Sequence, residues 1–242
     1  LITTKSGSQG TSSISYDFQY SINSLARRPE LLNSQEYLTQ MKEADPTFTD
    51  VNIRELISNG VWDGVSSTDW YDVAFNASPA SRHTVTFQGA NDKGSYFLSL
   101  NNLYDNGIIR EDRDTYKRLS VMLNADYKIK PWLKVGTTAN YANYTSKAIS
   151  DGSGGTSYVS MIATVMTLAP YIADTYPADA LPTQMQAQIA NGFTLLQNAN
   201  GDYYSCLGTM EQVHPMVAIR MNDKKNTGNS LMGTLYANFT PI

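Results

Sequence analysis

The chain has 242 residues, long enough for one sizeable domain or for part of a larger barrel. Its 18 basic and 22 acidic residues give a net charge of −4, which argues against a general nucleic-acid-binding protein. The single Cys206 excludes an intrachain disulfide, and His83 and His214 lack cysteine partners at zinc-ligand spacing, so the composition predicts no metal and no cofactor.

The composition is rich in tyrosine and low in charge. The chain has 16 tyrosines, and only 17% of its residues are charged. Tyrosine combines an apolar ring with a polar hydroxyl, which suits a wall between lipid and water. No run of 18 or more apolar residues occurs, so the sequence predicts no transmembrane helix.

The first ten residues precede the regular pattern. Leu1–Lys5 is predicted to be the end of a short strand, and residues 6–10 to be a flexible link. Because the chain begins directly in this β-rich phrase, without methionine or a signal peptide, we expect it to be an internal piece of a longer polypeptide.

Residues 13–22 have the clearest strand pattern. Apolar side chains occupy every second position, and small or polar residues lie between them. Three of the five apolar residues are aromatic, which fits lipid contact better than a small, tightly filled core. The apolar positions are Ile14, Tyr16, Phe18, Tyr20 and Ile22.

Residues 23–81 lose this alternation and carry helix signals. Asn33 is placed to cap a short amphipathic helix, and a second helix is predicted over Asp50–Ser58, ending near Gly60. The segment is too long for a hairpin loop, so we expect a folded excursion or a separate small lobe.

Within this excursion three aromatic residues, Trp62, Trp70 and Tyr71, flank the polar stretch Asp63–Asp69. Flat aromatic rings beside carboxylates can stack on sugars or anchor a partner protein, which makes these residues candidate contacts for a substrate or partner. The alternative interpretation is that the rings simply hold a long loop together.

Two further strands follow, at residues 82–89 and 95–104, joined by the tight turn Asn91–Gly94. His83, alone in a strand, is predicted to be a surface or interface residue and not a catalyst. The loop 105–114 has clustered carboxylates, but their spacing matches no EF-hand loop, so we predict a solvated loop tip.

The longest alternating part of the chain is Thr115–Lys147, where two runs are separated by a turn at residues 130–132. Soluble strands usually have about five or six residues, whereas a strand that crosses a bilayer needs about 9–11. Both runs reach that length.

A second excursion, 148–229, includes possible helical segments near 158–168 and 184–190, and an alternating run at 230–239 ends the pattern.

Six strands are therefore predicted, and the connections between them alternate in length. Residues 23–81, 105–114 and 148–229 form the longer connections, and the turns at 91–94 and 130–132 are short. In an up-and-down meander, alternate connections lie at opposite ends. We thus predict an all-β fold in which 11–242 provides about six antiparallel strands of a transmembrane barrel, with long, partly helical loops at one end.

The alternation also predicts which side chains share a face. Apolar side chains should point outward to lipid, and polar ones should point to the lumen. The outward set is Ile14, Tyr16, Phe18, Leu119, Val121, Leu123 and Leu235, and the lumen set is Ser15, Asp17, Ser120 and Asn124.

Several phrases, taken in order, resemble the SusC/RagA family of TonB-dependent outer-membrane transporters. They cover about residues 1–145, and residues 150–228 do not contribute to the resemblance. The phrases are Leu1–Lys5, Ser15-Tyr16, Leu31–Tyr37, Thr68-Asp69-Trp70, Ser95–Ile109, Tyr116–Ser120 and Trp132–Gly136.

In that family a plug domain precedes a barrel of about 22 strands. The resemblance implies that residues 1–10 end the plug and that residues 11–242 form the first barrel strands, with 23–81, 105–114 and 148–229 outside the cell. It implies uptake of oligosaccharides or peptides across the bacterial outer membrane. The implied partners are a SusD-like surface lipoprotein and the TonB complex, which would bind a segment absent from this chain.

Two other classes of function compete with this one. A soluble β-rich carbohydrate-binding or adhesion module would pack its strands into two closed layers and use the aromatic residues as a sugar platform. A hydrolase has little support, because no nucleophile and base stand out in the sequence. The expected protein is therefore not an enzyme.

Overall fold

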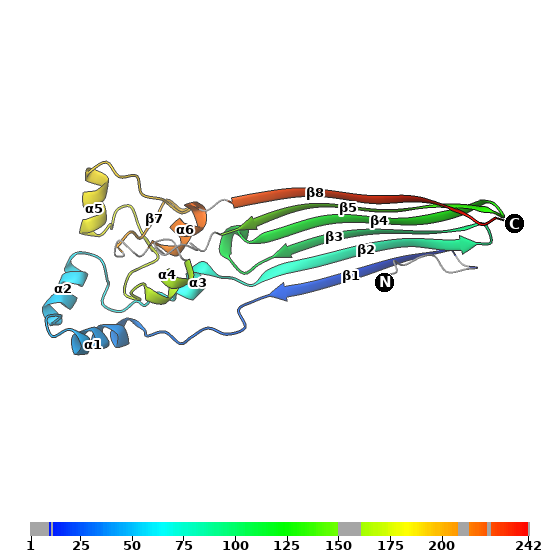
Figure 1. Cartoon of the computed structure of the whole chain (residues 1–242). Coiled ribbons are helices and arrows are strands. Elements are labelled where there is room, and N and C mark those ends of the chain that lie inside the picture. Colours follow the sequence, from blue (N-terminus) through cyan, green and yellow to red (C-terminus); the bar gives the residue numbers. More distant parts are fainter. Residues whose placement is uncertain (1–9, 11, 150–160, 208–212, 222–223, 242) are drawn as a thin grey trace.

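The computed structural model describes residues 10, 12–149, 161–207, 213–221 and 224–241. Long strands form one sheet, and short helices gather into a lobe at one end of it (Figure 1). The two tight hairpin turns lie at the opposite end. The fold is therefore mostly β, with an antiparallel sheet and with helices in the connections that were predicted to be partly helical.

The sheet has six strands of 11 to 16 residues, and each pairs antiparallel with its neighbour. Their order in the sheet is β1-β2-β3-β4-β5-β8, which is the predicted meander. The strands are β1 Ser13–Asn23, β2 Ser78–Asn91, β3 Gly94–Asn106, β4 Thr115–Lys130, β5 Leu133–Ala148 and β8 Lys224–Phe239.

Strand β2 is longer than the alternation at residues 82–89 predicted. Its first residues pair with the end of β1, where Asn23 lies opposite Ser78. Pro79 cannot donate a ladder hydrogen bond, so the local sequence argues against a strand at this position. Pairing with β1 nevertheless extends β2 through it.

The register places the two predicted sets of side chains on opposite faces of the sheet. Residues that pair across antiparallel strands share a face. One apolar row runs across all six strands through Tyr16, Val85, Leu100, Val121, Tyr141 and Leu231, and the adjacent polar row includes Asp17, Thr84, Asn101 and Ser120. The predicted separation of faces is confirmed, and the assignment of the apolar face to lipid stays a prediction.

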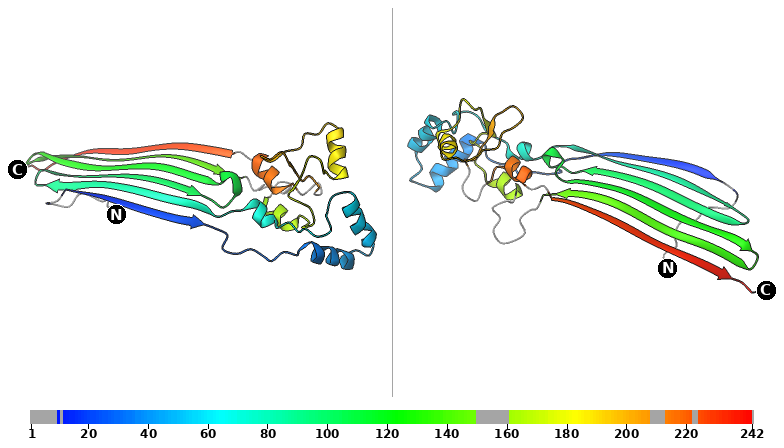
Figure 2. Two further views of the ribbon diagram at one scale, coloured as in Figure 1. Left: turned by 180° about the vertical axis from the view of Figure 1, so that it is seen from behind. Right: turned by 90° about the horizontal axis from the view of Figure 1, so that it is seen from above.

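The sheet is a single layer in the described part of the chain, with β1 and β8 at its edges (Figure 2). Its apolar face is uncovered, since Leu235 is 85% exposed and Ile14 is 72% exposed. The soluble-module alternative required two closed layers, and these strands do not form them.

The lobe is built mainly from the two long excursions. Its helices are α1 Ser34–Ala44, α2 Asp50–Ser58, α3 Trp70–Ala74, α4 Met161–Thr167, α5 Thr183–Ala190 and α6 Pro215–Met221. It also has a small two-stranded sheet of β6 Thr175–Tyr176 and β7 Tyr203–Tyr204, and a 3-10 turn, η1 Arg110–Asp112, lies in the loop between β3 and β4. Among the described residues, no helix is long and apolar enough to cross a membrane.

The two predicted helices of the first excursion are present. Asn33 caps α1 with a capping box, in which the Asn33 side chain accepts from the Glu36 amide and the Glu36 carboxylate accepts from the Asn33 amide. Helix α2 has the predicted bounds, and Gly60, with a φ of 73°, follows its C-cap residue Asn59.

The hydrophobic core lies in the lobe and not in the sheet. It joins α3, α4 and α6, which come from both excursions and lie side by side in the lobe. Its members are Trp70, Tyr71, Ala74, Val165, Leu168, Ala169, Ile172, Tyr204, Met216 and Ile219.

The predicted end of the plug, residues 1–10, falls outside the described residues except for Gly10, whose amide donates to Ala90 O.

Candidate functional site

The polar face of the sheet is lined by side chains that bond to one another across strands. Asn101 Nδ2 donates to Thr84 Oγ1 over 2.7 Å, and Thr138 Oγ1 donates to Asn124 Oδ1 over 2.6 Å. Near the hairpin end, Asp126 accepts from Ser95 and forms a 3.0 Å ion pair with Lys134. Such a face is suited to water or to a polar ligand.

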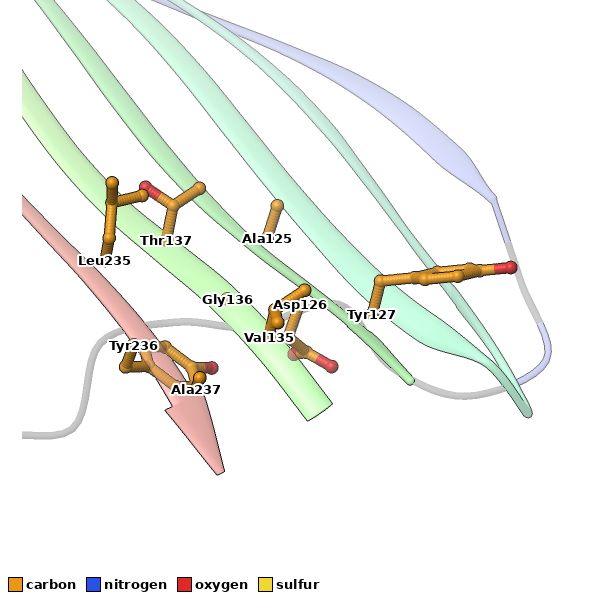
Figure 3. Close-up of a pocket in the computed structure, with 9 residues that line it drawn as sticks. All are labelled: Ala125, Asp126, Tyr127, Val135, Gly136, Thr137, Leu235, Tyr236 and Ala237. Atoms are coloured by element: carbon orange, nitrogen blue, oxygen red, sulfur yellow. The ribbon is translucent and has the colours of Figure 1, made fainter. Parts of the chain in front are cut away.

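Figure 3 shows a hollow near the hairpin end, where β4, β5 and β8 lie side by side. The floor contains small residues, and Ala125 and Thr137 stand on one side of the strands while the Tyr236 ring lies on the other. The ring of Tyr236 covers Gly136, where any Cβ would collide with it. Asp126, the one carboxylate of its lining, is already paired with Lys134 and Ser95, so the hollow presents no nucleophile with a base.

The three predicted aromatic contacts are buried in the lobe. Trp70 is 1% exposed, its Nε1 donates to Ala169 O over 3.2 Å, and Asp69 caps its helix by accepting from the Tyr71 amide. Trp62 Nε1 donates to Ser66 O over 2.8 Å and so closes the Asp63–Ser66 turn. Their burial agrees with the alternative that the rings hold the excursion together, and the contact role stays a prediction.

Trp70 and Tyr71 also line a pocket of about 610 Å³ between the two excursions. Its walls come from the extended segment 28–33, from residues 67–71, and from the end of α4 with Pro170. Arg28 lies at the pocket and pairs with Asp69 over 3.0 Å and with Asp72 over 2.9 Å. The pocket thus combines apolar walls with a fixed set of charges.

A buried histidine lies behind this pocket. The ring of His214 packs edge-on against Trp70, with centroids 5.2 Å apart, and its Nδ1 accepts from the Met216 amide. Its Nε2 lies 3.0 Å from Asp174 Oδ1, and within the described residues neither atom has a well-oriented hydrogen bond. Among the described residues, no nucleophilic side chain bonds to His214 or Asp174. The pair therefore does not resemble a hydrolytic site.

The loop between β3 and β4 is tied to the second excursion. Arg220 of α6 donates to both carboxylate oxygens of Glu111, at 2.6 to 3.1 Å, and to Gln197 O. The bonds to Glu111 raise the pKa of the Arg220 guanidinium. Glu111 and Asp112 both have positive φ, so the tip of the loop has a strained backbone.

Below that tip, burial raises the pKa of the Asp114 carboxyl, although it accepts from the Ile109 amide. The tip itself, Arg110–Asp112, is exposed as predicted, whereas Asp114 below it is half-buried. Among the described residues, no three His, Cys, Asp or Glu side chains come together as a possible metal site.

Sequence reasoning missed α3, α6 and the Glu111–Arg220 pair. Two local signals were available: Asp69 is a good N-cap residue, and Pro215 is typical of the first turn of a helix. The ion pair had no local signal, because its partners are 109 residues apart in sequence.

No known family model matches the chain. Individual relatives do. The TonB-dependent receptor P3 of Formosa agariphila is 23% identical over 211 residues, which are 84% of this chain and 20% of that protein. The TonB-dependent receptor SusC of Bacteroides thetaiotaomicron is 23% identical over 237 residues, which are 97% of this chain and 22% of SusC.

Solved structures share the fold. The RagAB peptide transporter matches with a TM-score of 0.72 and 19% identity, over 99% of this chain and 27% of that one. The RagAB peptide importer in its closed-closed state matches with a TM-score of 0.66 and 20% identity. The matched part of these structures contains the meander together with its helical lobe.

The chain spans about a fifth of the length of the curated relatives that it matches. Homology to TonB-dependent receptors, a non-enzymatic family, implies the bacterial outer membrane as its location. Over nearly its full length, the chain is a distant homologue of the SusC/RagA-type TonB-dependent receptors and corresponds to roughly a quarter of such a protein.

Proposed function

We propose that this chain is part of the wall and surface loops of a transporter that imports oligosaccharides or peptides across the outer membrane with energy from TonB. The observation that carries the proposal is the match of both meander and lobe to the RagAB peptide transporter over 99% of the chain. The two-faced strands, with every longer connection at one end, support it independently.

In this proposal six strands form only part of the barrel. An open edge facing lipid would leave the unpaired backbone groups of β1 and β8 without partners, at several kcal/mol for each group. Further strands of the full-length protein would therefore continue the sheet at both edges. The apolar face would meet lipid, and the polar face would line the lumen.

The lobe is the proposed region of contact with the substrate and with a SusD-like lipoprotein. Loops held on a rigid sheet commonly carry recognition. The pocket between segment 28–33 and α4 is the best-formed place for it, because Trp70 and Tyr71 give it a fixed floor while Leu31 and Leu32 remain exposed at its rim. Trp70 and Tyr71 would then act mainly by shaping this pocket, and Trp62 by holding the nearby Asp63–Ser66 turn.

The function is tested on the intact transporter purified with its lipoprotein. Calorimetry against a panel of oligosaccharides and peptides should identify at least one ligand, and vesicles containing the complex should take it up. Replacing Trp62 or Trp70 with alanine should weaken ligand or lipoprotein binding without preventing membrane insertion. A complex that binds and transports no member of the panel would contradict the proposal.

The orientation is tested by cysteine labelling of whole cells. If the lobe is outside, a cysteine introduced at Val65, which is 79% exposed, should react with a membrane-impermeant reagent in cells that lack the lipoprotein. A cysteine at Asp92 in the β2–β3 turn should react only after lysis. The reverse pattern would show that the topology is wrong.

A further inference from the structure

The apolar face of the sheet has an unusual distribution of charge. All three acidic residues of the described strands, Asp17, Asp105 and Asp126, lie on the polar face. Apart from Lys130 at the irregular hairpin end, the lysines of the apolar face are Lys117, Lys147 and Lys225, and all three lie at the lobe end. This end of the face is therefore purely cationic.

The height of these lysines can be compared with the thickness of a membrane. A strand rises about 3.4 Å per residue, and at a tilt of about 40° each residue adds about 2.6 Å of height. A hydrocarbon band of about 25 Å then corresponds to about ten residues, which on β5 leads from Leu133 to Asn143. The apolar face should end at the row that contains Asn143.

The side chains change character at that row. Phe18 and Leu119 still belong to this row, but its other four residues are polar, namely His83, Asn102, Asn143 and Asn229. Asn143 Nδ2 donates to Asn229 Oδ1 over 2.6 Å. Lys117 lies one row beyond it, and Lys147 and Lys225 lie two rows beyond it. These steps are about 5 and 10 Å of height, and a headgroup layer is about 5–7 Å thick. Lys117 therefore lies within that layer, and the long side chains of Lys147 and Lys225 can reach its outer edge.

The three lysines lack acidic partners. No ion pair joins any of them to a carboxylate in the part of the chain that the structure describes, where Lys117 Nζ lies over the Tyr104 ring at 5.2 Å. Lys147 and Lys225 are direct cross-strand partners, an arrangement of like charges that is unfavourable by itself. An anion bound between them would relieve this repulsion.

The geometry points to a lipid site: we propose that Lys117, Lys147 and Lys225 bind the phosphate groups of phosphorylated glycolipids in the outer leaflet. The inference rests on the proposed membrane wall. Phosphate provides several oxygen acceptors for lysine ammonium groups, and the long lysine stems can lie on the apolar face while their ends reach the headgroups. The row of histidine and asparagine side chains just below would offer hydrogen bonds to the sugar part.

The test uses the full-length transporter that contains this chain, purified in detergent and titrated with bisphosphorylated lipid A while native mass spectrometry counts bound lipids. Each lysine near an anionic surface should contribute about fivefold in affinity, so Lys117→Gln, Lys147→Gln and Lys225→Gln together should weaken binding about a hundredfold. Lipid A without its phosphates should bind the wild type as weakly as the phosphorylated lipid binds the triple variant.

A matched control removes the same charge from the opposite face at the same end of the sheet, with Arg82→Gln, Arg118→Gln and Lys224→Gln. This control should bind the phosphorylated lipid like the wild type. Equal losses in both triple variants, or no preference for the phosphorylated lipid, would overturn the lipid site.

Membrane insertion, measured by heat-modifiable migration, separates this inference from the proposed function. Variants that insert and still bind the lipid normally would refute the lipid site alone, whereas a wild type that does not insert would refute the wall and the site with it. If the triple variant does not fold, each single substitution should still cause about a fivefold loss, and three unchanged single variants would overturn the inference.

Discussion

The sheet and the lobe bury their apolar side chains in opposite ways. In the lobe, aromatic and aliphatic residues from distant segments close on one another, and Trp70 is 1% exposed. In the sheet, the apolar face stays exposed, and Leu235 on it is 85% exposed. The lobe has its own core, whereas the apolar face of the sheet needs lipid or another covering.

The contribution of a hydrophobic side chain to stability therefore depends on what covers it. Trp70 stabilises the lobe through protein contacts, and Val121 would stabilise the protein only through contact with lipid. The two regions should therefore respond differently to substitution, and four measurements on the full-length protein can separate them.

The largest effect is expected for Trp70→Ala, which leaves a cavity among α3, α4 and α6. Removing a buried tryptophan ring should cost about 3–5 kcal/mol of lobe stability, while the sheet is unaffected. Hydrogen exchange should therefore quicken in the three helices and not in β2–β5. Trp132→Ala, at a position that is 41% exposed in a hairpin turn, is the control and should leave the lobe unchanged. Equal acceleration in the sheet would mean that the two regions are not independent.

The next effect concerns the apolar face. Val121→Arg should cost about 2–4 kcal/mol if the site lies near the middle of the bilayer, because the guanidinium replaces a lipid-facing side chain. Ser120→Arg, one residue away on the polar face, should cost clearly less. Urea unfolding of the protein in lipid vesicles gives both values. A greater cost for Ser120→Arg would reverse the assignment of the faces.

The pH dependence of the lobe provides a further test. Burial raises the pKa of Tyr176 to about 12 from its usual value near 10, and its hydroxyl donates to Val61 O over 2.6 Å. Because the folded pKa is the higher one, this contribution to stability is complete below pH 10 and is lost as the pH rises toward 12.

Exchange rates in the lobe should therefore increase between those two pH values, and tyrosinate absorbance should develop late for this residue. Tyr176→Phe removes the titrating group, so this variant should have a flatter profile. An unchanged profile in Tyr176→Phe would assign the pH dependence to another group.

The smallest effect is local. Asn33→Ala removes the side chain that caps α1 and should destabilise that helix by about 1 kcal/mol. Asn33→Ser keeps a capping oxygen and should restore most of the loss. Exchange of the α1 amides reports the difference, and α2, which has its own cap at Thr49, provides an internal reference. Loss of the α2 signal in Asn33→Ala would show that the two helices unfold as one unit.

The sheet could be predicted almost completely from local sequence patterns. Alternation is a local property, since each side chain of a strand points opposite to its neighbours, and the six strands, their tight turns and the two faces could be predicted from it. The capped helix α1 and the bounds of α2 were accessible for the same reason, because a cap and the first turn of a helix lie within a few residues of each other.

Only the tertiary structure decided how the excursions fold together. Trp70 Nε1 bonds to Ala169 O across 99 residues, and Glu111 pairs with Arg220 across 109. No periodicity encodes such contacts, so the sequence named Trp62, Trp70 and Tyr71 as candidates and left open whether they faced a ligand or one another. The meander brings both excursions to the same end of the sheet, and the burial of their apolar side chains in a shared core then turned two long loops into one lobe.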